Sequence, residues 1–79
     1  MRQFEPLDEK FVEKVKLLVV GDFCHFTLSS SMYVIWRVHN GFVVKAQHNI
    51  IFSPIFKKIS LTTIRQAVGE LIADEVHSS

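Results

Sequence analysis

The first quarter of the chain carries hydrophobic side chains at helical spacing. They recur every three or four residues, as on the buried face of an α-helix: Leu7, Phe11, Val15 and Leu18. Pro6 suits a first helical turn, and Gly21 is typical of the position just after a helix end. This pattern predicts a helix over residues 6–20. The run 17–20 fits a strand entering a tight turn equally well, so both interpretations stay open.

A short aromatic-rich segment and two longer β-rich runs follow, and we expect three strands. They cover residues 23–28, 32–39 and 42–48. The last two runs are separated by Asn40 and Gly41, which tolerate the positive φ of a type I′ turn. This spacing predicts a β-hairpin.

The predicted hairpin has two different faces, because side chains alternate along a strand. With a two-residue loop, one face is mainly apolar: Met32, Val34, Trp36, Val38, Val43, Lys45 and Gln47. The other face mixes aromatic, aliphatic and basic residues: Tyr33, Ile35, Arg37, His39, Phe42, Val44, Ala46 and His48. If helices cover the first face, the second stays open and is too apolar to lie in water without a partner. The sequence leaves open which face is buried.

The segment after the hairpin is apolar but contains Pro54, which argues against a central strand. Within residues 49–58 we expect a short strand continuation and then a loop over the core. Ser60 suits a helix N-cap, and helical spacing of apolar residues predicts a helix over residues 61–76. Residues 1–79 are therefore expected to form one α+β domain of order α-β-β-β-α. Its antiparallel sheet would carry two helices on one face.

Composition favours a small folded domain. The 79 residues are 48% hydrophobic and 22% charged, with a net charge of +1, which does not fit a disordered chain. No apolar run approaches the ~20 residues of a membrane span, and no signal-peptide pattern is present, so we expect no membrane contact. A single cysteine cannot form an internal disulfide, which favours a cytoplasmic location. Because a chain this small cannot bury so many hydrophobic residues, we expect it to form a homo-oligomer, most simply a dimer.

Residues for catalysis or metal binding follow no recognisable pattern. The three glycines are too scattered for a phosphate-binding loop. Cys24 and His25 are strand neighbours and point to opposite faces, so they do not form a nucleophile–base pair. His39 and His48 lie at opposite ends of the hairpin, too far apart to share a metal ion within one chain. We therefore predict a protein that is not an enzyme and uses no metal or cofactor. An enzyme using Cys24 and a hairpin histidine is a remote alternative.

Charge is unevenly distributed along the chain. No Asp or Glu occurs within residues 23–69, and the charged residues of this stretch are all basic: Arg37, Lys45, Lys57, Lys58 and Arg65. These five are candidate ligands for an anion or a nucleic acid, because together they create a local positive field. The lysine pair 57–58 also precedes a predicted helix N-terminus, whose free N–H groups attract anions.

Two features resemble nucleic-acid-binding families. The α-β-β-β-α order, with the lysine pair directly before the last helix, resembles the double-stranded-RNA-binding domain, in which that helix and its lysines contact phosphates. The glycine-rich approach to these lysines and the alanine-rich helix of that family are absent. Residues 60–71 are similar to the recognition helix of gluconate-operon-type winged-helix repressors. That similarity implies that Thr62, Thr63 and Arg65 face DNA.

Together these features predict a small regulatory module that works through protein–protein contact, as an inhibitor or adaptor, and is dimeric. The candidate partner-binding residues come from one hairpin face and the following loop: Tyr33, Arg37, Phe42, Phe52 and Phe56. The basic residues would steer an acidic partner. The alternative is a nucleic-acid-binding protein that uses the basic stretch and the N-terminus of the last helix.

Overall fold

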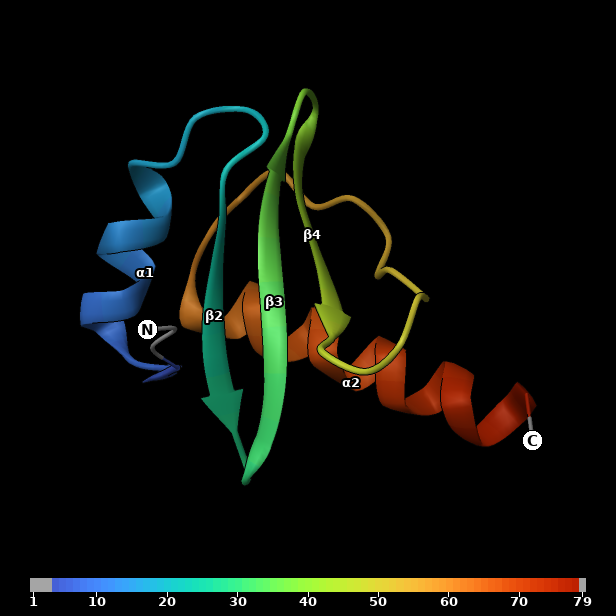
Figure 1. Ribbon diagram of the computed structural model, residues 1–79. Coiled ribbons are helices and arrows are strands. Elements are labelled where there is room, and N and C mark those ends of the chain that lie inside the picture. The colour runs from blue at the N-terminus through green and yellow to red at the C-terminus, as the bar shows by residue number, and fades with distance from the viewer. Residues whose placement is uncertain (1–3, 79) are drawn as a thin grey trace.

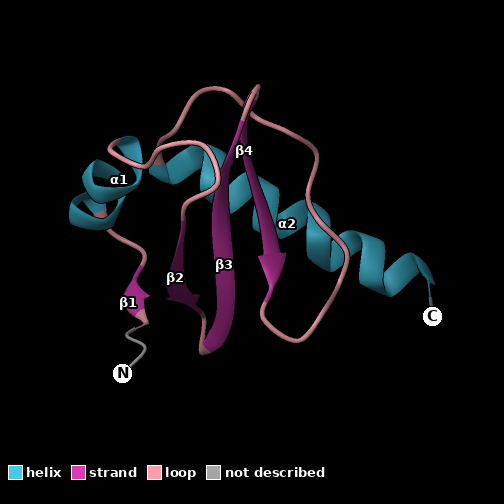
Figure 2. Ribbon diagram, turned by 45° about the horizontal axis from the view of Figure 1, so that its top comes forward, coloured by secondary structure: helices cyan, strands magenta, loops and turns pink. Residues whose placement is uncertain are grey.

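The computed structural model describes residues 4–78, and side chains over residues 4–73. Its elements, in chain order, are β1 (Glu5–Pro6), α1 (Glu9–Lys16), β2 (Phe23–Leu28), β3 (Ser31–Val38), β4 (Gly41–Ala46) and α2 (Leu61–Ser78). The strands form one sheet in the order β1-β2-β3-β4, with α2 behind it (Figure 1) and α1 beside the start of α2 (Figure 2). The predicted α+β class is confirmed. The sheet is mixed rather than antiparallel, because β1 runs parallel to β2.

The first helix is shorter than predicted because its expected first turn belongs to the sheet. The two residues of β1 pair with Phe26 and Thr27 of β2. Asp8 then caps α1: its side chain accepts a hydrogen bond from the Phe11 backbone N–H at 2.9 Å. The predicted helix 6–20 is therefore too long at both ends.

Residues 17–22 form turns, so neither alternative for this run, helix or strand, is correct. α1 ends at Lys16, with Leu17 as its C-cap. Gly21, expected to stop the helix, has a φ of +97° in the turn into β2, where its N–H donates to the Arg37 carbonyl at 2.9 Å. Three apolar side chains of these turns remain exposed: Leu17, Val19 and Val20.

The β3–β4 hairpin is present, but its turn lies one residue earlier than predicted. Val38 pairs with Gly41, and the two residues between them have no positive φ, so the type I′ prediction is wrong here. The register differs from the predicted one by two residues, a shift that leaves each side chain on its predicted face. Positive φ at both turn residues occurs instead between β2 and β3, at Ser29 (53°) and Ser30 (66°).

The core lies between the helices and one face of the sheet. On α1, Phe11 packs with its ring centre 5.3 Å from that of Phe26, which in turn stacks on Tyr33 at 5.5 Å. Further core residues come from β3, β4 and α2: Ile35, Phe42, Val44, Ile64, Ala67, Val68 and Leu71. On β2, Cys24 and Phe26 face the core side, and Phe23, His25 and Thr27 face the other side.

The segment after β4 closes the free edge of that strand. Ser53 donates its backbone N–H to the Val44 carbonyl at 2.7 Å, and its Oγ accepts from the Val44 N–H at 3.0 Å. Isolated β-bridges to β4 at Phe52 and Phe56 flank this contact. We call residues 52–56 the strap. The loop that was expected over the core therefore runs along the edge of β4 and satisfies its backbone groups.

α2 begins where predicted and has a reciprocal cap. Ser60 Oγ accepts from the Thr63 N–H at 3.1 Å, and Thr63 Oγ1 accepts from the Ser60 N–H at 2.9 Å. The helix crosses behind the strands, and its C-terminal part extends past β4 (Figure 1). In the described part of the chain, no helix combines the length and the apolar character that crossing a bilayer requires.

Two glycines provide a matched test of the strap. Gly41 has a φ of +148°, and an added Cβ would lie 2.9 Å from the carbonyl carbon of Phe56. Gly69 lies within α2 and has nothing within 4 Å of an added Cβ. We expect Gly41→Ala to lower the free energy of unfolding by about 2 kcal/mol or more, and Gly69→Ala to raise it by about 1 kcal/mol. Urea unfolding followed by circular dichroism measures both. A Gly41→Ala protein as stable as the wild type would contradict the close approach of the strap.

Candidate protein-contact surface

No described helix covers the face of the sheet opposite α1 and α2, and strand register arranges the side chains of this face in rows. Partners in neighbouring strands lie on the same face. The first row runs His25, Val34, Lys45, from β2 to β4. Phe52 of the strap extends this row at one end through its bridge to Lys45, and Phe4 extends it at the other, with its ring 4.9 Å from that of His25.

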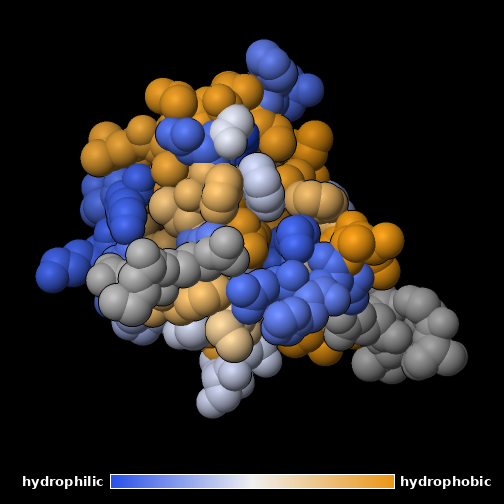
Figure 3. Space-filling view, in the orientation of Figure 1, coloured by the Kyte–Doolittle hydropathy of each residue, from blue (hydrophilic) through white to orange (hydrophobic). Residues whose placement is uncertain are grey.

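A second row lies beside the first and consists of Phe23, Trp36 and Val43. The Phe23 ring is 4.5 Å from that of Trp36 and 5.4 Å from that of His25, so aromatic contacts join the two rows. We call these two rows, together with Met32, the outer face. Figure 3 views the molecule from this side, and hydrophobic residues occupy much of its upper half.

Apolar side chains of the outer face are accessible to a partner. Phe23 is 47% exposed and Met32 is 42% exposed, whereas Val34 and Val43 are buried beneath their neighbours. Trp36 is half-buried, and its Nε1 is buried with no acceptor in the described part of the chain. The valines thus form a rigid floor that carries exposed rings and a thioether, side chains that are enriched in protein interfaces.

The outer face has almost no polar group free to bind a charged ligand. The ammonium group of Lys45 donates to three backbone carbonyls, those of Ala46, Gln47 and Asn49, at 3.1 to 3.3 Å. An ammonium has three N–H donors, so none is left for a phosphate. No residue of the outer face is Asp or Glu.

The predicted partner-binding residues are divided between the two sides of the sheet. Tyr33 and Phe42, expected on an open face, are buried in the core at 6% and 2% exposure. The Arg37 guanidinium lies 4.8 Å from the centre of the Phe42 ring, and Phe56 packs on that ring at 6.0 Å, so these three form a cluster on the helix side. Of the predicted set, Phe52 alone belongs to the outer face. The helices cover the hairpin face from which the others were chosen.

The predicted anion-binding residues do not form one cluster either. Lys57 and Lys58 are exposed in the loop before α2, and Arg65 is exposed on that helix; none of them has an ion pair within the described residues. This loop passes behind the strands (Figure 1). The outer face therefore lies on the opposite side of the sheet from these three, while Arg37 stacks on a buried ring and Lys45 is held by carbonyls.

Sequence reasoning missed three members of the outer face: Phe4, Phe23 and His25. The signal for two of them was available, because alternation along residues 23–28 separates Phe23 and His25 from the core residue Phe26. Assigning Phe23 and His25 to the same face as the hairpin residues Val34 and Trp36 required the β2–β3 register, which the structure supplies. Phe4 could not be placed, because its position depends on the pairing of β1.

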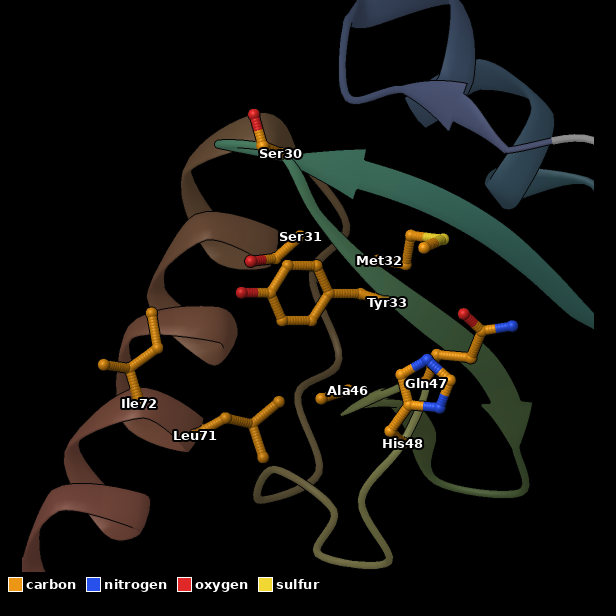
Figure 4. Close-up of a pocket in the computed structure, with 9 residues that line it drawn as sticks. All are labelled: Ser30, Ser31, Met32, Tyr33, Ala46, Gln47, His48, Leu71 and Ile72. Atoms are coloured by element: carbon orange, nitrogen blue, oxygen red, sulfur yellow. The ribbon is translucent and has the colours of Figure 1, made fainter.

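A hollow of about 330 Å³ lies on the helix side, between the β2–β3 turn and α2 (Figure 4). The Tyr33 hydroxyl points across it toward α2, near Ser31 and Ile72, and His48 lies on the other side of the Tyr33 ring. Its described lining consists of apolar and uncharged polar residues together with His48. It includes no carboxylate beside Tyr33 or His48.

Cys24 is buried on the core side of β2, away from His25. Burial raises the pKa of its thiol above the ordinary value, an effect that nearby Lys14 partly offsets. Within the described residues, no three His, Cys, Asp or Glu side chains lie close enough together to hold a metal ion.

The raised pKa of Cys24 predicts low thiol reactivity. Because less thiolate is present at a given pH, we expect alkylation by iodoacetamide at pH 8 to be slower in the folded chain than in urea. Stability should fall as pH rises above about 8.5, because the unfolded thiol loses its proton first. Mass spectrometry of the time course measures the rate, and equal folded and unfolded rates would contradict the burial.

Comparison of the chain with protein-family models, curated proteins and solved structures finds no match. The observed order, β-α-β-β-β-α with β1 parallel to β2, departs from the α-β-β-β-α order on which the resemblance to the double-stranded-RNA-binding domain rested. For the winged-helix resemblance, the element before α2 is the strap rather than a helix. The function has to be inferred from the surface itself.

Proposed function

We propose that the chain is a non-enzymatic module that acts through protein–protein contact, in the manner of an inhibitor or adaptor, and that the outer face is its contact surface. The observation that carries this proposal is the line of four touching rings on that face: Phe4, His25, Phe23 and Trp36. Phe23 is exposed and the other three rings are partly buried, and aromatic side chains held by a sheet in this way supply contact area at low entropic cost.

The distribution of charge supports a protein partner for this face over a nucleic acid. A single strand that stacked its bases on Phe23 and Trp36 would need cations beside the rings for its phosphates. The donors of Lys45 are occupied, and Lys57, Lys58 and Arg65 lie on the other side of the sheet. Stacking and phosphate neutralisation therefore cannot act on one bound strand at this face.

Site-specific photo-crosslinking in the native host tests this proposal. A benzophenone-bearing phenylalanine analogue at position 23 should form protein adducts, because that side chain lies in the contact surface. The matched control places the analogue at Ile72, which is 50% exposed, close to the 47% of Phe23, and lies on α2. Adducts from position 23 and not from position 72 are expected. No adduct from position 23, or the same adducts from both positions, would overturn the proposal.

A second candidate function is nucleic-acid binding on the helix side, favoured by Lys57, Lys58 and Arg65, which are exposed and have no ion pair with another described residue. Three phosphate contacts would make log K fall with log salt at a slope of roughly −2 to −3. Fluorescence anisotropy of labelled RNA and DNA at two salt concentrations measures this slope. The variant Lys57→Glu/Lys58→Glu should abolish such binding, and Phe23→Lys should not. Absence of binding at low salt would exclude this candidate.

A further inference from the structure

We infer that the partner that packs on the outer face is a second copy of this chain, so that two sheets meet face to face in a symmetric dimer. This inference rests on the proposed function and names the partner of the same surface. It follows from three properties of the described residues: which edges of the sheet are closed, what charge the outer face carries, and how large the face is.

Both edges of the sheet are unsuitable for adding another strand. At β4, the strap already occupies the backbone groups of Val44 and Phe42 through Ser53 and Phe56. At the other edge, β1 is only two residues long and includes Pro6, which has no N–H to donate. The helices cover the inner face. Association through the sheet is therefore left with the outer face.

The charge of the outer face suits a partner of the same kind. A partner with a charged contact surface would lose hydration there without gaining an opposite charge, because the face has no Asp or Glu and the Lys45 donors are occupied. A second copy brings Lys45, whose donors its own backbone carbonyls already occupy, and no other Lys, Arg, Asp or Glu of the outer face. It offers rings and a thioether, which pack well against the same groups.

The size of the face fits a weak dimer. The strands β2, β3 and β4 pair over about six residues each and cover roughly 15 by 20 Å, and Phe4 and Phe52 extend this surface at its two sides. Stable interfaces begin at about 600 Å² of accessible surface per partner. Because the exposed rings project from the sheet, the accessible area of the outer face is larger than its projected area. Exposed Ile51, next to Phe52, extends the edge of the face.

The expected geometry follows from general sheet packing. Two sheets pack about 10 Å apart with strands inclined by about 30°. A twofold axis near Trp36, which lies in the middle strand of the second row, would bring Phe23 and Met32 of each copy against the partner's rings. Such a contact uses the same patch twice and closes at two copies.

Sedimentation velocity, combined with the fluorescence of Trp36, tests this inference. Trp36 is the one tryptophan of the chain, so acrylamide quenching reports on the outer face alone. Over about 1 µM to 1 mM, the range of moderate dimer affinities, we expect the mass to rise from 9.1 kDa to twice that value while quenching decreases. A mass that stays at 9.1 kDa, or quenching that does not change with concentration, would overturn the inference.

The matched variants locate the interface. Phe23→Lys/Met32→Lys places like charges opposite each other across the twofold axis and should weaken the dimer by about 100-fold. Ile72→Lys changes a comparably exposed apolar residue on α2 and should dimerise like the wild type. Circular dichroism confirms that each variant is folded. Dimers that survive the double change, or that are lost in Ile72→Lys, would place the interface elsewhere and contradict the inference.

Failure of this inference can be told apart from failure of the proposed function. A monomeric chain that still forms adducts with a different protein from position 23 would show that the second-copy inference is wrong while the contact surface is right. A monomeric chain without adducts from position 23 would overturn both. Adducts of twice the chain mass from position 23, together with a concentration-dependent dimer, support both.

Discussion

The structure depends on one constraint: both faces of the sheet are apolar, and the helices cover only one of them. Phe26, Ile35 and Val44 on the covered face are completely buried and join α1 to α2 through a single core. In the described part of the chain, no further helix or strand covers the opposite face. The aromatic rows that remain there are therefore the direct consequence of how the core is built, and they form the surface on which we propose that a partner packs.

The strap further limits how the sheet can contact another molecule. Its hydrogen bonds with Val44 remove the backbone groups through which an edge strand would recruit another chain, and Gly41 leaves room for the strap to approach. Pro54 within the strap prevents it from becoming a regular strand that would itself expose an edge. Side-chain packing on the outer face is then the main route by which this sheet can contact another molecule, and such contacts favour shape and apolar area over charge.

Basic residues and aromatic rings, which lie close together in the sequence, are separated by the fold. Arg37 stacks on Phe42 within the helix side, and the lysine pair 57–58 lies behind the strands. Lys45 belongs to the outer face, but backbone carbonyls hold its ammonium group. The acid-free stretch that gives the chain a basic appearance thus contributes no single basic surface. This separation weakens the alternative of nucleic-acid binding by the outer face and leaves it open for the helix side.

Local sequence determined the elements whose hydrogen bonds are local. The strand 23–28, the hairpin and the helix that begins after Ser60 follow from alternation and capping, and these elements are confirmed. The turn residues Asn40 and Gly41 placed the hairpin turn one position too late. Alternation also determined which residues share a face, so the two-residue change of register left the faces intact. Only the tertiary structure decided which face is covered, because that choice depends on packing between distant helices and on what β2 adds to each side. For the same reason Tyr33 became a core residue, and Phe23, unremarkable in the sequence, came to lie beside Trp36 at the centre of the open surface.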